Sequence, residues 1–420
     1  MLSREQNDLI TQTGPGTPGG DMFRRYWHPV LLSEELPSGG DPVAIDILGE
    51  ELVAFRDEKD RIGLLDRHCC HRGADISYGR LEDGGIRCLY HGWLFDVNGQ
   101  CLEQPAEPPG SSFKDKVCQQ AYPTHEAGGA IFAYMGPGAA PEFPAYEYLN
   151  MQEGQFSVYK VFEDCNYHQA NEGNIDPVHV GFLHRNFNAD NPFTMHEVTP
   201  ELEVEETDFG FRLYQMRPGP EGKKNLRVTN FCLPDWSIIS GPQGGDGYIA
   251  IWHVPVTDHS HWRWGFAIRR DITIGPDGTP SEDIDFRSRH SNEFTAERHF
   301  VRNAGNRYHQ DRAKMRSENF NGMGSNFNVH DAFASESQGA IADRTKRHLA
   351  SSDAGVICAQ QQLLDAVEAV RCGAEPLGVV RDPAKNDFRH LDGFDVLIDQ
   401  DADPRAFVAD YFKGRAEAAE

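Results

Sequence analysis

The sequence predicts an α+β protein, with a small β-domain near the N-terminus and a larger domain that joins an antiparallel sheet to helices. Short strands and turns dominate residues 42–135, whereas longer strands and helices fill the chain from residue 157 onward. A proline-rich stretch, 136–146, separates the two patterns of secondary structure and is typical of a linker. This change in pattern predicts two domains with different architectures.

Hairpins explain the first part of the chain. Residues 43–47 alternate in polarity, a Gly-Glu turn follows, and residues 52–56 return as a second strand. The pair Asn98-Gly99 is the strongest short signal for a hairpin turn. Residues 130–135 form a further apolar strand before the linker.

The second part begins with a helical stretch near 163–184. Four longer strands are expected after it, and they cover 202–216, 226–232, 248–255 and 261–270. A helix near the C-terminal end carries apolar residues at helical spacing, with Gly373 just past its end.

Composition excludes several classes of protein. The net charge of −25 over 420 residues opposes binding to nucleic acid or to an anionic membrane surface. No run of eighteen or more apolar residues occurs, so we expect no membrane-spanning segment, and the polar first residues do not resemble a signal peptide. Nine scattered cysteines do not form a small disulfide scaffold, so we expect a reducing cytoplasm and some thiols that bind a metal.

Two arms of metal-ligating residues stand in the β-domain. Cys69-x-His71 is followed, after sixteen residues, by Cys88-x-x-His91. A structural zinc site usually has two cysteines in one arm, whereas each arm here mixes one thiol with one imidazole. A Rieske [2Fe-2S] cluster needs two thiolates on one iron and two imidazoles on the other, which mixed arms supply. The neighbouring His68 and Cys70 are expected to be a loop residue and a packed side chain.

A second group of ligands lies in the segment 171–185, NEGNIDPVHVGFLHR. Two histidines and a distant carboxylate form the facial triad of non-heme Fe(II) oxygenases, and His179 and His184 are the candidates. On a regular helix these two residues would diverge by about 140°, so the helix must break between them, near Gly181. Asp176 before Pro177 also suits a helix N-cap.

The third ligand to this metal should be a carboxylate from a later helix. Four acidic residues in the later helical region are candidates: Asp331, Glu336, Asp343 and Asp353. Asp331 could instead cap a helix that begins near Ala332.

These motifs resemble those of the Rieske non-heme iron aromatic-ring oxygenases. CCHRG and CLYHGW match the family's cluster motif, and Asp-x-x-His-x-x-x-x-His matches its mononuclear iron motif. The segments EGNIDPVHVGFLH and HDAFASESQGAIADRTKRHL are similar to the phthalate dioxygenase group, whose oxygenase has α subunits only. The resemblance covers nearly the whole chain. It implies a Rieske domain over 41–145, a helix-grip catalytic domain over 146–420, and an N-terminal segment, 1–40, that belongs with the catalytic or oligomeric part.

The resemblance also implies roles for single residues. Cys69 and Cys88 would hold the buried iron of the cluster, and His71 and His91 the outer iron. His179, His184 and Asp331 would bind the mononuclear iron, with Asp343 as the alternative third ligand. Asp176 would carry electrons from His91 of a neighbouring subunit to His179. Many members have Asn four residues before this aspartate, where this chain has Glu172.

The implied activity is that of a terminal oxygenase with one [2Fe-2S] cluster and one mononuclear Fe(II). No Gly-x-Gly-x-x-Gly strand–helix unit exists for a nucleotide, so NAD(P)H would act only through a partner reductase or ferredoxin. The resemblance implies a homotrimer, single or stacked. The substrate would be an aromatic, carboxylated compound, oxidised with O₂ by ring dihydroxylation or by O-demethylation.

Two questions stay open at this point. The chain could instead be a Rieske electron-transfer protein with a structural C-terminal domain, which would hold two irons per chain rather than three. An arginine could pair with a substrate carboxylate, and three candidates occur on the expected strands: Arg227, Arg212 and Arg217.

Overall fold

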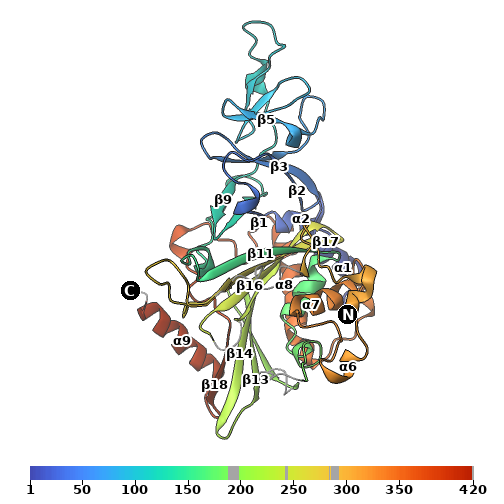
Figure 1. Cartoon of the computed structure of the whole chain (residues 1–420), viewed down its shortest axis with the longest axis vertical. Helices are drawn as coiled ribbons and strands as arrows, with labels where there is room; N and C mark the ends of the chain where they lie inside the picture. The colour runs from blue at the N-terminus through green and yellow to red at the C-terminus, as the bar shows by residue number, and fades with distance from the viewer. Residues whose placement is uncertain (188–197, 242–244, 283, 285–292, 419–420) are drawn as a thin grey trace.

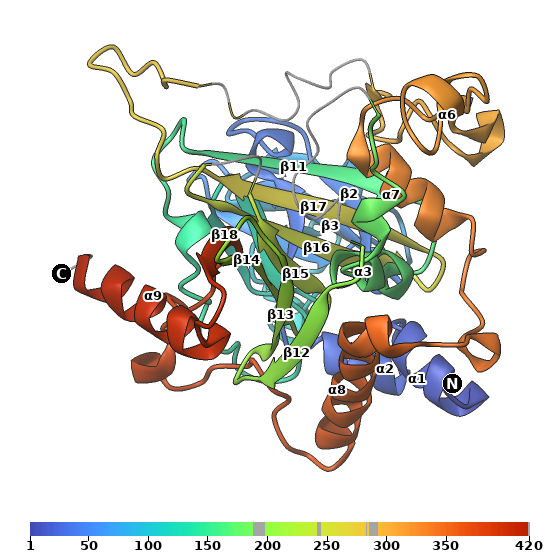
Figure 2. The ribbon, with the colours of Figure 1, turned by 90° about the horizontal axis from the view of Figure 1, so that it is seen from below.

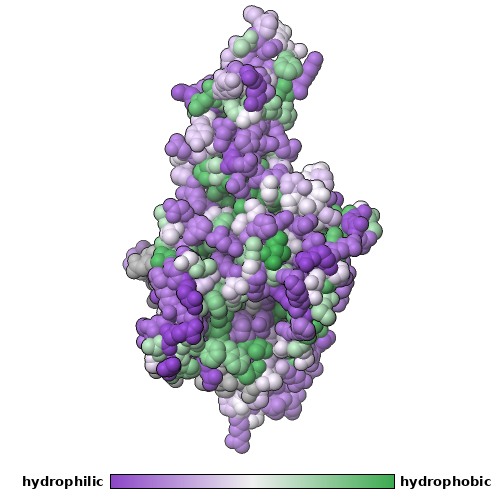
Figure 3. Space-filling model, turned by 90° about the vertical axis from the view of Figure 1, so that its right-hand side faces the viewer, coloured by the Kyte–Doolittle hydropathy of each residue, from purple (hydrophilic) through white to green (hydrophobic). Residues whose placement is uncertain are grey.

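The computed structural model describes residues 1–420 except for 188–197, 242–244, 283, 285–292 and 419–420. Figure 1 shows a narrow β-module at one end of the molecule and a broader body, with a large sheet and most of the helices, at the other. Figure 3 shows the same division on the surface, with apolar side chains gathered on the lower half of the body. The predicted α+β class is therefore confirmed.

The β-module contains short antiparallel strands. The strands that form its two small sheets are β2 (Val43–Ile47), β3 (Glu50–Arg56), β4 (Ile62–Asp66), β5 (Arg80–Glu82), β6 (Gly85–Arg87), β7 (Leu94–Asp96) and β8 (Cys101–Glu103). Phe55, Leu65 and Phe95 form part of its own buried core. The predicted turn at Asn98-Gly99 lies between β7 and β8, where Gly99 has a φ of 80°.

The N-terminal residues join the two parts. Strand β1 (Trp27–Leu32) pairs with β10 (Ala130–Tyr134), which also pairs with β9 (Thr124–Ala127). Helices α1 (Arg4–Thr11) and α2 (Pro18–Phe23) pack instead against α8 (Ala354–Arg371) of the body.

The body is built on an eight-stranded antiparallel sheet. Its order is β11-β17-β16-β15-β14-β13-β12, with β18 paired to β14. The strands are β11 (Phe156–Glu163), β12 (Glu201–Glu206), β13 (Gly210–Pro218), β14 (Lys223–Cys232), β15 (Trp236–Ser240), β16 (Tyr248–Thr257), β17 (Ser260–Ile268) and β18 (Phe394–Asp399). The rings of Trp236 and Trp252 stack at 4.7 Å in the core beside this sheet.

Helices flank the sheet, with α9 (Pro404–Ala418) on one side and the others on the opposite side (Figure 2). Besides α1, α2 and α8 they are α3 (Tyr167–Asn174), α6 (Lys314–Ser317), α7 (Phe327–Glu336) and α9. Helix α8 packs on β12 and β13 through a buried stripe that includes Val356, Leu363 and Val367. Helices α3 and α7 pack on each other, and α3 also contacts β16 and β17.

Two predicted elements differ from those in the structure. The helix expected over 163–184 is a strand end, the short helix α3 and a single 3₁₀ turn, because Asn166 caps a helix that already ends at Asn174. The strand expected over 202–216 is a hairpin, since the chain turns between β12 and β13.

The alternative role of Asp331 as a helix cap is also wrong. Helix α7 begins at Phe327, directly after its N-cap Asn326, whose side chain accepts a hydrogen bond from Asn328 N. Asp331 therefore lies inside the helix, and its carboxylate is not used to satisfy the helix end.

Two further features bear on function. Among the described residues, no helix is both long enough and apolar enough to cross a bilayer. All nine cysteines are free thiols, and Cys69 and Cys88 are among those that are buried.

Candidate metal centres

Two tight loops of the β-module carry the first group of ligands. The carbonyl of Cys69 accepts a hydrogen bond from Gly73 N at 2.7 Å, and that of Cys88 accepts one from Gly92 N at 3.0 Å. Gly73 and Gly92 have φ values of 73° and 72°, in the left-handed region that glycine adopts most readily. The two arms of the motif therefore share one turn geometry.

These loops place two thiols inside and two imidazoles outside. Cys69 and Cys88 are each 2% exposed and interact through their side chains, whereas His71 and His91 are half-buried, with ring centroids 4.5 Å apart. Burial raises the pKa of Cys69 to about 12, which favours the neutral thiol unless a cation is bound. The donor set fits a [2Fe-2S] cluster with thiolates on its inner iron and imidazoles on its outer iron.

Neighbouring side chains fix these rings. Trp93 stacks on His71 with centroids 4.3 Å apart and an interplanar angle of 6°. Sequence reasoning missed this contact, although Trp93 follows His91 by only two residues. His68 contacts Glu51 at 3.1 Å. Cys70 was expected to be packed, and this is wrong, because its thiol is exposed.

A break in the helical backbone positions the second group of ligands. Helix α3 ends at Asn174, and the Asp176 carboxylate then accepts a hydrogen bond from Val178 N at 2.7 Å. A single 3₁₀ turn, His179–Gly181, follows. This path brings the rings of His179 and His184 to 5.1 Å, which a continuous helix would not allow.

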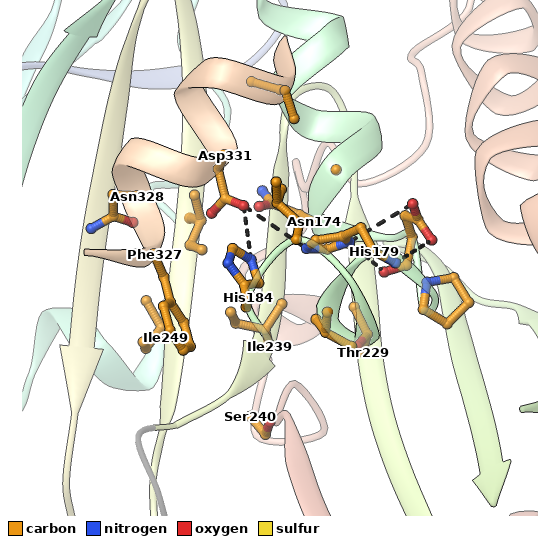
Figure 4. A pocket seen from close by; sticks show the side chains of 18 of the residues that line it. Asn174, His179, His184, Thr229, Ile239, Ser240, Ile249, Phe327, Asn328 and Asp331 are labelled. Carbon is orange, nitrogen blue, oxygen red and sulfur yellow. Dashed lines mark hydrogen bonds and ion pairs between the residues drawn. The ribbon is translucent and has the colours of Figure 1, made fainter. Parts of the chain in front are cut away.

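Asp331 completes this second group from the middle of α7. The ligand atoms of His179, His184 and Asp331 all lie within 4.8 Å of one another. Asp331 Oδ1 is 3.0 Å from His184 Nε2 and 3.9 Å from His179 Nε2 (Figure 4).

The charges of this group suit a divalent metal. Burial opposes ionisation of Asp331, but the neighbouring His184 and Arg263 hold its pKa below the usual range. Burial, and then His184, lower the pKa of His179, which favours the neutral imidazole that binds metals. Two imidazoles and one carboxylate fit the facial triad of a mononuclear iron site.

The other acidic candidates lie elsewhere. Glu336 bonds to Tyr308 and to the backbone of Asp164. Asp343 caps a 3₁₀ turn and pairs with Arg4 and Lys346, as expected for a surface ion pair. Asp353 accepts a hydrogen bond from Ala350 N.

Sequence reasoning also missed residues around the triad. His330 lies next to Asp331 in sequence, and its Nδ1 is 3.1 Å from Nδ1 of His184. Arg263 Nη2 is 3.5 Å from Asp331 Oδ2. Nothing in the sequence around Arg263 indicates that this residue lies near the metal site. Asn174 lies beside His179 and Asp331 in Figure 4.

One large cavity of about 1160 Å³ opens on the triad. Ile239, Ile249 and Phe327 contribute apolar surface to it, and Arg227 contributes a guanidinium. Arg212 and Arg217 are not among its lining residues: Arg212 bonds to Asn230, Glu205 and the His390 carbonyl, and Arg217 bonds to the Pro177 carbonyl.

Glu172 and Asp176 differ in their surroundings. Glu172 is buried and accepts hydrogen bonds from Arg344, Arg347 and Gln360. The side chain of Asp176 keeps 32% of its surface exposed while its backbone carbonyl contacts Nδ1 of His179 at 3.0 Å. Glu172 is thus held in a structural ion-pair network, whereas Asp176 reaches the surface.

Several known proteins with similar sequences are oxygenase subunits. Residues 26–123 match the Rieske [2Fe-2S] domain, and residues 133–420 match the LigXa C-terminal domain-like family. The chain is 33% identical to the phthalate 4,5-dioxygenase oxygenase subunit of Pseudomonas putida, over 98% of this chain and 96% of that protein. It is 32% identical to the 5,5'-dehydrodivanillate O-demethylase oxygenase subunit of Sphingobium sp. (strain NBRC 103272 / SYK-6), over 92% of this chain and 85% of that one.

A solved structure shares the fold. The Pseudomonas putida CBB5 NdmA QL mutant with theobromine superposes with a TM-score of 0.63 at 19% identity, covering 86% of this chain and 96% of that chain. The domain matches and the full-length similarity agree with the two groups of metal-binding side chains. Because the second group fits a mononuclear iron, the chain is not an electron carrier without an oxygenase site. The chain belongs to the Rieske non-heme iron oxygenases, whose members carry a [2Fe-2S] cluster and a mononuclear iron.

Proposed function

We infer that this chain is a terminal oxygenase subunit that oxidises an aromatic carboxylate with O₂. The observation that carries this inference is that Arg227 lines the same cavity as His179, His184 and Asp331. A guanidinium binds a carboxylate through two parallel hydrogen bonds, which would hold an aromatic acid in a fixed orientation. Apolar side chains such as Ile249 would cover the ring.

The guanidinium of Arg227 has N–H donors available for such a ligand. Its side chain is 17% exposed, and Asp395 Oδ2 lies 3.8 Å from Nη1, beyond hydrogen-bond distance. Asp395 instead accepts a hydrogen bond from Asn225 through its other oxygen. A substrate carboxylate would therefore gain bonds that the protein itself does not make strongly.

The residues proposed to hold the metals follow from the two groups of ligands. Cys69 and Cys88 would bind the inner iron of the cluster, and two imidazoles the outer iron. His179, His184 and Asp331 would bind the mononuclear iron, which supplies O₂ binding and reduction when it is present.

Two reactions fit the cavity and the relatives. Ring dihydroxylation would correspond to the phthalate 4,5-dioxygenase, and O-demethylation to the 5,5'-dehydrodivanillate O-demethylase. A volume of about 1160 Å³ is large for a single ring, which favours a larger or heavily substituted aromatic acid. An assay for formaldehyde separates the two reactions, because only O-demethylation releases it.

Electrons would have to cross between subunits of a homotrimer. The β-module and helix α7 lie at separate levels of one chain, with the sheet of the body between them (Figure 1). Tyr78, Leu89 and Tyr90 are all exposed beside the cluster loops, at 75%, 60% and 56%. Such an apolar rim would suit a neighbouring subunit whose Asp176 faces His91.

A separate reductase or ferredoxin would deliver the electrons. Both curated relatives named above are oxygenase subunits, which implies partner components in those systems. A reducing cytoplasm suits a chain whose nine cysteines are free.

Replacing Arg227 tests the substrate class. Arg227→Met should raise KM for an aromatic acid about tenfold to a hundredfold, with kcat nearly unchanged, because charged hydrogen bonds contribute about 1.5–3 kcal/mol. Arg227→Lys keeps the charge and should lose less. The methyl ester of the same substrate should respond little to either change. An unchanged KM for the acid would remove Arg227 from the substrate site.

A further inference from the structure

A second cluster of titratable side chains lies beside the mononuclear site. Glu163, His253 and His261 come from β11, β16 and β17, and their ligand atoms lie within 4.8 Å of one another. All three side chains are at most 1% exposed. Glu163 and His261 stand directly opposite each other on paired strands.

Hydrogen bonds determine which ring nitrogen of each histidine in this cluster carries the proton. His261 Nδ1 is 2.8 Å from the Cys165 carbonyl, which only accepts, so this nitrogen carries the proton. His261 Nε2 must then accept from His253 Nδ1, which is 3.0 Å away. His253 Nε2 in turn accepts from the Asn174 amide at 2.8 Å. Both imidazoles are thereby fixed as neutral Nδ1–H tautomers.

Glu163 offers this hydrogen-bonded series a place for one more proton. Among the residues that the structure describes, neither carboxylate oxygen has a hydrogen-bond partner, although both are buried. The nearest basic atoms are His261 Nε2 at 3.3 Å and Arg263 Nη1 at 4.0 Å. Because a buried carboxylate without a donor is costly, a proton between Glu163 and His261 would stabilise the cluster.

The cluster opens on the cavity of the iron site. Glu163, His253 and Asn174 line the cavity that also contains His179 and Asp331. His253 Nε2 contacts Asn174, which lines the same cavity, so a proton on Nε2 would lie beside that cavity.

We propose that Glu163, His261 and His253 store one proton and deliver it to the cavity during turnover. This inference rests on the oxygenase activity. Ring dihydroxylation combines the substrate, O₂, two electrons and two protons into a diol. O-demethylation consumes the same two electrons and two protons and yields a phenol, formaldehyde and water. In either reaction the cluster of Glu163, His261 and His253 supplies one of the two protons.

The proton moves in two linked steps. In the loaded state His261 carries protons on both nitrogens and pairs with Glu163. His253 then carries its proton on Nε2, and the Asn174 amide is turned so that its oxygen, rather than its nitrogen, accepts from that N–H. The His253 Nε2–H bond breaks as the proton passes to an acceptor in the cavity. The His261 Nε2 proton then moves to His253 Nδ1, which restores the two neutral imidazoles seen in the structure.

Several charged or titratable groups face the cluster from the surrounding elements: Arg263 and Tyr159 on the sheet, Asp331 and Glu336 on α7, His168 on α3, and Cys165 and Tyr308. Burial, then His261 and Arg263, lower the pKa of His253 well below its usual value. An extra proton is therefore not expected to rest on His253.

Nitrogen-15 NMR of the histidine side chains tests, without turnover, whether Glu163, His261 and His253 hold one proton. The full chain is used with Zn(II) in place of the mononuclear iron and with the cluster oxidised, and the signals are assigned by single substitutions. At high pH both His253 and His261 should be Nδ1–H tautomers, and His261 should take up one proton as the pH falls. Glu163→Gln should abolish that uptake. An Nε2–H tautomer at either ring at high pH, or unchanged uptake in Glu163→Gln, would overturn the proposal.

Single-turnover kinetics test delivery. Glu163→Gln should slow product formation about a hundredfold and introduce a solvent isotope effect, while iron content stays normal. Asp235→Asn is the matched control, because Asp235 is a buried carboxyl 3.7 Å from His28 and does not line the cavity. It should leave the isotope effect unchanged. A wild-type rate and isotope effect in Glu163→Gln would contradict delivery, and the NMR result stands apart from any error in the substrate class.

Discussion

The Nδ1 atoms of His184 and His330 face each other at 3.1 Å, and His330 Nε2 lies 3.1 Å from the Gly324 carbonyl. Since a carbonyl only accepts, His330 donates from Nε2 and accepts at Nδ1. His184 must then carry its proton on Nδ1, which leaves its Nε2 free to bind the metal beside Asp331. His330 thus selects the metal-binding tautomer of His184.

Removing His330 should weaken iron binding. His330→Phe deletes the acceptor for His184, and the affinity for Fe(II) should fall about 10–100-fold while the cluster stays loaded. Titration of the iron-depleted protein with Fe(II) measures this. His125→Phe, which changes a histidine of strand β9, should leave the affinity unchanged. Equal affinity in His330→Phe and the unmodified protein would show that His330 does not orient the ligand.

Asp331 should be needed for the mononuclear iron alone. Asp331→Ala removes the carboxylate that lies 3.0 Å from His184, so the protein should lose that iron and keep the visible absorption of the cluster. Asp343→Ala should keep all its iron, because Asp343 pairs with Arg4 and Lys346. Metal analysis that found the third iron in Asp331→Ala would assign the ligand elsewhere.

The sequence predicted the parts of the sites that depend on local spacing. Cys69, His71, Cys88 and His91 lie on two short turns, so their spacing alone indicates that they meet. The need for a break between two histidines five residues apart also followed from helix geometry, and the backbone changes to a 3₁₀ turn there.

Residues brought together by the tertiary fold were not predictable in this way. Arg263 and Asp331 are far apart in sequence and meet only because α7 packs near β17. The strand over 202–216 was misjudged because a hairpin and a single long strand can share the same alternation of side chains. The sequence did not indicate that His253 and His261 lie together, because their hydrogen bonds depend on strand register.

Acid should destabilise the fold through His168. Burial lowers the pKa of His168 to about 3. Within the described part of the chain neither ring nitrogen makes a hydrogen bond, although Nε2 lies 3.4 Å from a Glu172 oxygen. Between pH 6.5 and 3 the unfolded chain binds a proton that the folded chain does not, so stability falls as the pH falls. His168→Phe should reduce this slope by up to about 1.4 kcal/mol per pH unit. Urea unfolding across this range measures the slope.

The exposed His259 provides the control for that experiment. His259→Gln should leave the pH dependence of unfolding unchanged. A slope in His168→Phe equal to that of the unmodified protein would mean that His168 is protonated in the folded state.

Asp176 should be required for electron transfer but not for metal binding. Asp176→Asn keeps the hydrogen bond to Val178 N and removes the charge, so both centres should stay loaded while the reduced cluster is no longer reoxidised. Stopped-flow absorbance of the cluster follows this step. Asp164→Asn, at an exposed aspartate, should reoxidise normally. Normal reoxidation in Asp176→Asn would exclude the carboxylate from the electron path.

Mixed oligomers test most directly whether electrons cross between subunits. Cys88→Ser removes the cluster from one chain and Asp331→Ala removes the mononuclear iron from another, so each variant alone should be inactive. When the two are co-expressed with different tags and purified as mixed oligomers, oxygenase activity should recover, because the cluster of one chain serves the iron of its neighbour. Mixed oligomers as inactive as either parent would contradict electron transfer between subunits.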